Sequence, residues 1–286
     1  MKPVRFKYFA PETVAEAVAR LEEYGDEAKV LAGGQSLVPL MNLRLARPGV
    51  LVDICRIPRL DEIRRNGSLS IGATARQRAV RQSDEVAAAA PIITEVMRWV
   101  GHPATQSQGT FGGMAAHADP AAEIPAVLLA LDAELVATGR DGERAIPAGE
   151  FFSTWFTTTL APTEILTEVR IPASASQSRS AFLELARRHG DFAMVGAAAV
   201  VELDEAGTAE SSRLTLCGVG DTPVRAHGSE EFLVGRQLDS ATMQEAARMA
   251  AADLSPPSDV HASSEYRQEV AAVLVRRALE QIAADT

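Results

Sequence analysis

The stretch KVLAGGQS, residues 29–36, joins a strand-like apolar run to a pair of glycines, and TFGGM at residues 110–114 contains a second pair. Paired glycines let the backbone approach a ligand closely, because no Cβ intervenes and positive φ angles are open to them. Successive N–H groups on such a turn form a concave anion site, especially where a helix begins. Two such runs in one chain predict a ligand with two phosphates held from both sides, which indicates a dinucleotide.

The composition is that of a globular protein with more than one subdomain. The chain has 286 residues, of which 47% are hydrophobic and 23% charged, and its net charge is −10. This length exceeds the usual single core and predicts two or three subdomains. The negative charge argues against a nucleic-acid partner, which would need a basic face.

Cysteine usage and hydropathy predict the compartment. The only cysteines are Cys55 and Cys217, so this chain cannot supply the four thiolates of an iron–sulfur cluster, and we expect free thiols in a reducing cytoplasm. The N-terminus has no apolar core of signal-peptide length, and no uncharged apolar stretch is long enough to span a bilayer. We therefore expect a soluble, cytoplasmic protein without a membrane span.

Residues 1–174 are expected to form one domain with two lobes, at about 1–57 and 58–174. Apolar positions at helical spacing predict a helix after Pro11, and strands are expected at 29–32 and 50–54. Asn66-Gly67 between two apolar runs predicts a hairpin. The other elements expected in the second lobe are helical patches at 75–82 and 84–100, a helix within 121–131, and strands at 135–138 and 164–171.

The small polar segment around 173–178 places a boundary, and residues 175–286 are expected to form a second domain. Strand-like runs lie near 181–187, 194–203 and 213–219, and helices are expected near 227–234, 240–253 and 263–284. Strands followed by helices are typical of an α+β unit with helices on one sheet face. The predicted fold class is therefore α+β, and the C-terminal domain is expected to be a three-stranded antiparallel sheet with helices.

Each motif also has a purely structural interpretation. Two glycines between a strand and a helix are often only a turn, and neither the G-x-G-x-x-G fingerprint nor the P-loop pattern is present. Asp119 before Pro120 is expected to cap a helix, because proline suits the first helical position. His117 is open to a structural role as well as to ligand binding.

Catalytic and metal sites of the common kinds are not indicated. The histidines at 102, 117, 189, 227 and 261 show no metal-ligand spacing. No G-x-S-x-G elbow and no pair of carboxylates at acid–base spacing is present. If the chain is catalytic, a cofactor is expected to carry the chemistry, with no catalytic side chain and no metal held here.

The two runs and their neighbours resemble the FAD-binding medium subunit of the molybdenum hydroxylases, the xanthine dehydrogenase and carbon monoxide dehydrogenase family. The resemblance covers nearly the whole chain. The matching stretches are KVLAGGQSLVP at 29–39, VDI at 52–54, SIGA at 70–73, GTFGGMAAHADPAAEIP at 109–125, EIL at 164–166 and RRHGDFA at 187–193.

This resemblance implies a two-lobed FAD-binding domain of the PCMH/vanillyl-alcohol oxidase type, followed by a C-terminal domain. It implies a heterotrimer in which a large partner carries the molybdenum cofactor, a small partner carries two [2Fe–2S] clusters, and this chain passes electrons through FAD to a terminal acceptor. The assembly could be a single heterotrimer or a dimer of heterotrimers, and the sequence does not distinguish the two. Glu123 with Ile124-Pro125 resembles members that act on N-heteroaromatic compounds. The alternative is a stand-alone FAD-dependent oxidase or reductase with its own substrate pocket.

The resemblance also assigns roles along the chain. The first run should wrap the pyrophosphate with backbone amides and the second should approach it from the other lobe, while Glu123 should hold adenosine-side or ribityl groups. Leu166 and Phe192 should lie at the isoalloxazine, where an aromatic face can stack. The expected cofactor-binding residues are Ala32, Gly33, Gly34, Gln35, Ser36, Leu37, Thr110, Phe111, Gly112, Gly113, Met114, His117, Asp119, Glu123, Leu166 and Phe192.

The sequence departs from the family pattern at two places. Met114 stands where Asn or Ser is frequent, and Gln106-Ser107-Gln108 replaces a more typical Arg-Asn-Arg. Both changes are expected to affect flavin affinity or potential, and neither removes a glycine. Trp155 is assigned to the core or a subunit interface, and Arg187-Arg188 to a solvated pair.

Overall fold

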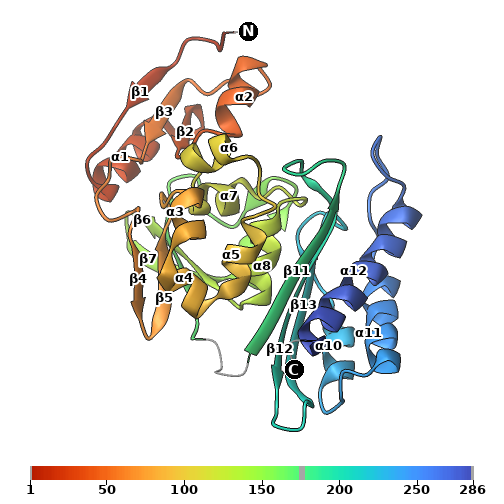
Figure 1. The fold of residues 1–286 in the computed structure, drawn as a ribbon. Helices are drawn as coiled ribbons and strands as arrows, with labels where there is room; N and C mark the ends of the chain where they lie inside the picture. Colours follow the sequence, from red (N-terminus) through yellow and green to blue (C-terminus); the bar gives the residue numbers. More distant parts are fainter. Residues whose placement is uncertain (1, 174–177, 285–286) are drawn as a thin grey trace.

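The computed structural model describes residues 2–173 and 178–284. The expected boundary at 174/175 lies outside the described residues. The chain forms an N-terminal lobe, a second lobe built on a five-stranded sheet, and a C-terminal sheet covered by helices (Figure 1). The fold is α+β, as the sequence predicts.

The N-terminal lobe is a small parallel sheet with one helix across it. Its strands are β1 (Lys7–Phe9), β3 (Val50–Asp53) and β2 (Ala28–Leu31), in that spatial order. Helix α1 (Val14–Tyr24) begins at Thr13, whose hydroxyl accepts a hydrogen bond from the Glu16 N–H at 3.1 Å. After a 3₁₀ turn, η1 (Gly25–Glu27), strand β2 leads through the first glycine run into the short helix α2 (Leu37–Asn42).

The second lobe is an antiparallel sheet in the order β4-β5-β10-β6-β7. The Asn66-Gly67 hairpin is confirmed, with Gly67 at φ +81°. Strand β10 enters the sheet between β5 and β6, although it is the last of the five along the chain. The bounds of the five strands are β4 (Ile63–Asn66), β5 (Ser68–Gly72), β6 (Glu134–Gly139), β7 (Gly142–Pro147) and β10 (Ile165–Ile171).

Short helices cover this sheet. The helical patch expected at 84–100 is divided at Ala90, because Pro91 opens a new helix in its first turn. The helices are α3 (Gln77–Gln82), α4 (Asp84–Ala89), α5 (Pro91–Val96), α6 (Pro103–Gln108), α7 (Phe111–His117), α8 (Glu123–Ala130) and α9 (Ala148–Phe151). A small hairpin, β8 (Phe152–Thr154) and β9 (Thr157–Thr158), follows α9. Buried side chains of α5, α7 and α8 share one core with β5, β6 and β10.

The C-terminal domain contains the three strands that the sequence predicts, and they pair antiparallel. They are β11 (Ser178–Ala186), β12 (Ala193–Leu203) and β13 (Ala209–Cys217), and the two-residue β14 (Val224–Arg225) adds a short fourth strand at the edge. The helices α10 (His227–Leu233), α11 (Ser240–Ala252) and α12 (Ser264–Ala284) pack on one face of this sheet (Figure 1).

The other face of the C-terminal sheet packs on the second lobe. Phe182, Ala198 and Val200 belong to the same hydrophobic core as α5 and α8. The Thr215 hydroxyl donates to the Ala126 carbonyl of α8 at 2.7 Å. Two residues after α8, Asp132 forms ion pairs with Arg213 and Arg225 of the C-terminal domain. The two domains therefore share a continuous interface rather than a flexible joint.

Candidate functional site

The first glycine run is a turn whose backbone N–H groups donate no hydrogen bond to the described protein. Gly34 has φ +70°, which only glycine adopts readily. Among the hydrogen bonds of the described chain, none has a donor among the N–H groups of residues 33–37. The Gln35 side chain donates to the Gly33 carbonyl at 3.0 Å and so steadies the turn. The run thus presents a series of unpaired donors, which suits an anion.

The second glycine run has a different structure from the one expected. It is the first turn of α7, with Thr110 as the N-cap, and its amides are already bonded within the protein. The Phe111 and Gly112 N–H groups donate to the carbonyls of Ala75 and Ala73 at 2.9 and 3.0 Å. The Gly113 N–H donates to the Thr110 hydroxyl at 3.1 Å. The expectation that both glycines expose amides is therefore wrong, because helix capping and an adjacent segment use those donors.

Glycine is needed in the second run for close packing. A Cβ on Gly112 would lie 2.6 Å from both the Cα and the Cβ of Ala73. Phe111 is fully buried in the core of the second lobe. This arrangement holds α7 tightly against the segment that follows β5.

The two runs nevertheless lie together. A Cβ on Gly33 would be 2.5 Å from the Gln108 carbonyl oxygen and 2.9 Å from the Thr110 nitrogen. A Cβ on Gly113 would be 3.5 Å from the Cβ of Ala32. The Arg76 guanidinium, which the sequence did not single out, donates to the Gln108 carbonyl. The junction between the lobes is therefore made by the same backbone that forms the candidate site (Figure 1).

The departures at Gln106 and Met114 have structural roles. The buried Gln106 amide donates to the carbonyls of Met97 and Val100 at 2.8 and 2.7 Å, which closes the turn before α6. Gln77 donates to the Met114 sulfur at 3.4 Å. Neither residue leaves a charged group at the second run.

Beyond α7 the chain turns at Ala118, which has φ +50°. The His117 ring lies 5.2 Å from the ring of Phe156, and burial lowers the pKa of His117, which favours the neutral imidazole. Burial raises the pKa of Asp119. Asp119 does not cap a helix as expected: its carboxylate accepts from the Ala121 N–H at 2.9 Å, and α8 begins at Glu123 with Ala122 as N-cap.

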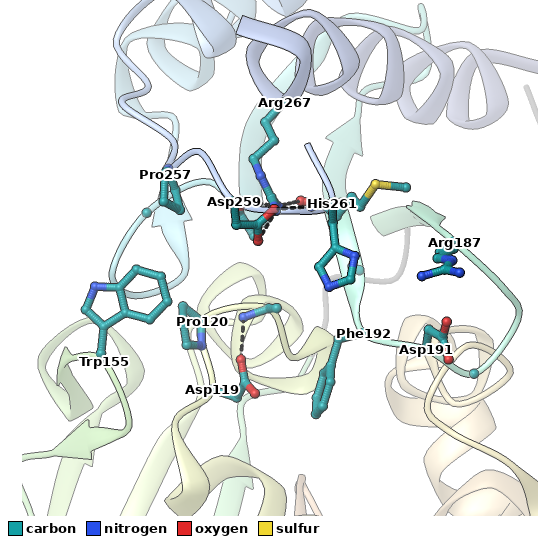
Figure 2. Close-up of a pocket in the computed structure, with 16 residues that line it drawn as sticks. Asp119, Pro120, Trp155, Arg187, Asp191, Phe192, Pro257, Asp259, His261 and Arg267 are labelled. Carbon is teal, nitrogen blue, oxygen red and sulfur yellow. Dashed lines mark hydrogen bonds and ion pairs between the residues drawn. The ribbon is translucent and has the colours of Figure 1, made fainter. Parts of the chain in front are cut away.

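A cavity of about 600 Å³ lies between the second lobe and the C-terminal domain. Figure 2 shows Asp119 and Phe192 on one side of it and Asp259 and His261 opposite. Phe192 is 56% exposed, so its ring has a free face. Trp155 at the rim donates to Asp221 at 2.5 Å, so it bridges the two domains instead of lying in the core.

Two of the expected site residues are buried. Leu166 is 4% exposed and belongs to the core of the second lobe. Glu123 is 2% exposed, and its Oε2 has no hydrogen-bond partner among the described residues. Burial raises the pKa of Glu123 to about 7. An orphaned carboxyl oxygen of this kind suits a polar ligand group.

Sequence reasoning missed a second buried acid. Glu184 on β11 is 9% exposed, and neither of its carboxyl oxygens has a hydrogen-bond partner among the described residues. Burial raises its pKa to about 8, and the nearby Glu123 contributes to this rise. The available signal was one acidic residue in the otherwise apolar run AFLELA at 181–186.

Family comparisons agree with this geometry. Residues 4–174 match the family described as the FAD binding domain in molybdopterin dehydrogenase, and residues 180–282 match the CO dehydrogenase flavoprotein C-terminal domain. The chain belongs to the FAD-binding medium subunits of the molybdenum hydroxylases. The resemblance stated from the sequence is thereby confirmed, and the flavoprotein subunit is part of an oxidoreductase.

Individual relatives cover 98% or more of the chain. The 6-hydroxypseudooxynicotine dehydrogenase complex subunit alpha of Paenarthrobacter nicotinovorans is 42% identical over 280 residues, which are 98% of this chain and 95% of the relative. Carbon monoxide dehydrogenase of Hydrogenophaga pseudoflava superposes with a TM-score of 0.97 at 38% identity, covering 99% of each chain. Quinoline 2-oxidoreductase of Pseudomonas putida 86 superposes with a TM-score of 0.95 at 35% identity, covering 100% of this chain and 99% of that one.

The residues of the flavoprotein subunit fit FAD. The first run offers unpaired amides next to the lobe junction, and Glu123 offers an unpartnered carboxyl oxygen. Among the described residues, no group of three or more His, Cys, Asp or Glu side chains could hold a metal ion. No helix within 2–173 or 178–284 is both long and apolar enough to cross a membrane.

Proposed function

We propose that the chain is the electron-transfer subunit of a heterotrimeric molybdenum-dependent hydroxylase. In this assembly a small partner holds two [2Fe–2S] clusters and a large partner holds the molybdenum cofactor. The observation that carries the proposal is the unpaired amide series of residues 33–37, in a chain that matches the medium subunits over its length. FAD, when bound, supplies the ability to accept electrons from a donor and release them to an acceptor.

The residues of this chain bind and orient the cofactor. The amides of residues 33–37 would hold the pyrophosphate, and the Thr110 hydroxyl would face it from the second lobe. His117 and Asp119 would lie along the path toward the flavin ring, where Phe192 offers a free aromatic face. Glu123 would meet a polar group of the cofactor with its orphaned oxygen. No side chain of this chain needs to act as a general base.

We assign residues 1–174 to the FAD-binding domain, with lobes at about 1–57 and 58–174, and residues 175–286 to the C-terminal domain. The buried position of Leu166 gives it a supporting role behind the cofactor contact. Ala32 belongs to the first run itself and faces Gly113, while Phe111, Gly112 and Met114 support the second run from the core of the second lobe.

We propose an N-heteroaromatic compound as the substrate of the complex. Quinoline is such a compound, and two similar proteins are named for quinoline and 6-hydroxypseudooxynicotine, whereas a third is named for carbon monoxide. Because the substrate would bind on the large partner, only the assembled complex can test this. A complex that oxidises carbon monoxide and no N-heteroaromatic compound would overturn the assignment.

Purification of the tagged chain from its native host tests the function. We expect co-purifying polypeptides, a visible spectrum with flavin and iron–sulfur absorption, and molybdenum by elemental analysis. Flavin alone, with substrate turnover by the isolated chain, would instead support a stand-alone flavoenzyme. A colourless chain that takes up no added FAD would refute both hypotheses. The mass of the intact complex distinguishes a heterotrimer from its dimer.

A further inference from the structure

The two glycine runs carry no charged side chain of their own. The stretches 30–43 and 99–118, which contain the runs, include no Asp, Glu, Lys or Arg. Burial lowers the pKa of His117 at the end of the second run, so its imidazole adds no full positive charge. Proteins commonly recognise phosphate oxygens with a guanidinium or an ammonium group in addition to backbone amides. A cation for a pyrophosphate at these runs would therefore come from another segment of the chain.

The backbone of Arg76 is fixed directly beside the second run. Arg76 is the N-cap residue of α3, and it pairs with Thr110 in an antiparallel β-bridge. The Gln77 N–H donates to the Gly109 carbonyl at 3.0 Å, and the residue before Arg76 accepts from the Phe111 N–H at 2.9 Å. Because these two bonds flank Arg76, its side chain starts from a defined position opposite the N-cap of α7.

The Arg76 guanidinium also reaches the first run. Its Nη1 donates to the carbonyl oxygen of Gln108. The same oxygen packs against the first run, since a Cβ on Gly33 would lie 2.5 Å from it. One backbone oxygen thus contacts both Gly33 and the guanidinium, which places the positive charge at the edge of the first run.

Cys55 places the guanidinium at this run from a second direction. The Cys55 thiol donates to the Ala32 carbonyl at 3.2 Å, at the start of the first run. Burial raises the pKa of this thiol, and the Arg76 guanidinium opposes the rise. The positive charge therefore acts on the backbone before Gly33 as well as on the segment that Gly33 packs against.

No acid neutralises this guanidinium within the described part of the chain. Arg76 takes part in none of the ion pairs there. The carboxylate of Asp53, the acid beside Cys55, accepts from the Cys55 N–H at 2.9 Å and from the Tyr8 hydroxyl at 2.5 Å. A guanidinium has several N–H donors, and the hydrogen bonds of the described residues use only Nη1 of Arg76. Its charge and its remaining donors are thus available to an anion.

We propose that Arg76 is a cofactor-binding residue whose guanidinium binds the pyrophosphate of FAD, together with the amides of residues 33–37. The proposal rests on the proposed function, which assigns the pyrophosphate to the first run. Arginine suits this role because its planar fork donates two parallel hydrogen bonds to phosphate oxygens, whereas lysine offers only a point charge. Arg76 is half-buried, so salt screens its charge less than that of a fully exposed side chain.

Arg78 provides a matched control on the same helix. It lies two residues after Arg76, is exposed, and lines a separate hollow with Pro103 and Gln106. Neutralising Arg78 changes the net charge of the chain by the same amount as neutralising Arg76. A difference between the two variants therefore reports the position of the charge and not the total charge.

The test measures FAD affinity of the full chain by flavin fluorescence titration, at several salt concentrations, for the wild type, Arg76→Gln, Arg76→Lys and Arg78→Gln. At low salt we expect Arg76→Gln to bind FAD about 10- to 100-fold more weakly, as for the loss of a hydrogen bond to a charged group. Arg76→Lys should lose less, because the charge stays and only the fork is removed. Arg78→Gln should keep the wild-type affinity.

The salt dependence distinguishes a phosphate contact from support of the lobe junction. Added salt should weaken FAD binding by the wild type, Arg76→Lys and Arg78→Gln, and should weaken it less in Arg76→Gln, because the attraction that salt screens is gone. An affinity loss in Arg76→Gln with the salt dependence of the wild type would overturn the proposal, since the residue would then only hold Gln108. If Arg76→Gln does not fold, Arg76→Lys decides, and an unchanged FAD affinity in that variant would overturn the paired contact.

Failure of the proposal is distinguishable from failure of the proposed function. Wild-type FAD affinity in Arg76→Gln would overturn the role of Arg76, while loss of FAD in Gly33→Val would still support the first run as the cofactor site. A wild-type chain that binds no FAD would refute the proposed function and the role of Arg76 with it.

Discussion

The two glycine pairs of this flavoprotein subunit look alike in the sequence and differ in the structure. At Gly33-Gly34 the amides of the turn are unpaired and Gly34 adopts φ +70°. At Gly112-Gly113 the amides are bonded inside the protein, and Gly112 packs against the backbone of Ala73. Glycine thus leaves backbone N–H groups free for a ligand in the first run and allows close packing in the second. Variants of the two runs should therefore differ in their effects on FAD affinity and on stability.

The largest effect is expected from Gly33→Val. Its side chain would meet backbone atoms of Gln108, Gly109 and Thr110, all within 2.9 Å of the first added carbon. Overpacking typically costs about 1–3 kcal/mol, and because backbone cannot rotate away we expect the upper end, about a hundredfold loss in FAD affinity. Flavin fluorescence titration measures this.

Gly228→Val is the matched control, because a Cβ at Gly228 has no atom within 4 Å. Its FAD affinity should equal that of the wild type. If Gly33→Val, folded by circular dichroism, retained wild-type affinity, the first run would not be the cofactor site.

A smaller and different effect is expected from Gly112→Ala. The added carbon would lie 2.6 Å from the Ala73 Cα, so α7 must move away from the segment after β5. We expect the free energy of unfolding to fall by about 1–3 kcal/mol. The loss of FAD affinity should be smaller than in Gly33→Val. Urea unfolding and fluorescence titration of the same samples measure both quantities, with Gly228→Ala as control. An affinity loss as large as that of Gly33→Val would remove the distinction between the two runs.

The smallest effect is expected from Thr110→Val. The hydroxyl caps α7 by accepting from the Gly113 N–H, and loss of such a cap costs about 1 kcal/mol. Thr110→Ser keeps the hydroxyl and should restore most of the stability. If Thr110→Val also weakened FAD binding and Thr110→Ser restored it, the hydroxyl would serve the cofactor as well as the helix. Equal stability of the two variants would contradict the cap.

Local sequence patterns predicted the helices and strands, but not which acceptors their backbone N–H groups bond. The Asn66-Gly67 hairpin and the three long C-terminal strands follow from turn chemistry and apolar runs, which are local. The amide of Gly112 is satisfied by Ala73, which is distant in sequence and adjacent only after folding. No spacing rule within residues 110–114 could reveal that partner.

The candidate site shows the same limit. The first run was identified because a strand, two glycines and a helix start follow one another. The prediction that Asp119 caps a helix was wrong. Its carboxylate accepts from the Ala121 N–H and closes a turn, and Ala122 is the N-cap of α8. The burial of the unpartnered carboxyl oxygens of Glu123 and Glu184 depends on the docking of two domains, so neither local sequence contains it.

The position of β10 has a consequence for biosynthesis. This strand fills the gap between β5 and β6, yet it is the last of the five to leave the ribosome. The hairpins β4–β5 and β6–β7 can form early, but the sheet that joins them has to wait for residue 171. Such non-local pairing is slow and leaves strand edges exposed in the meantime. We therefore expect flavin loading to follow translation of the entire FAD-binding domain, with chaperones protecting the unfinished sheet.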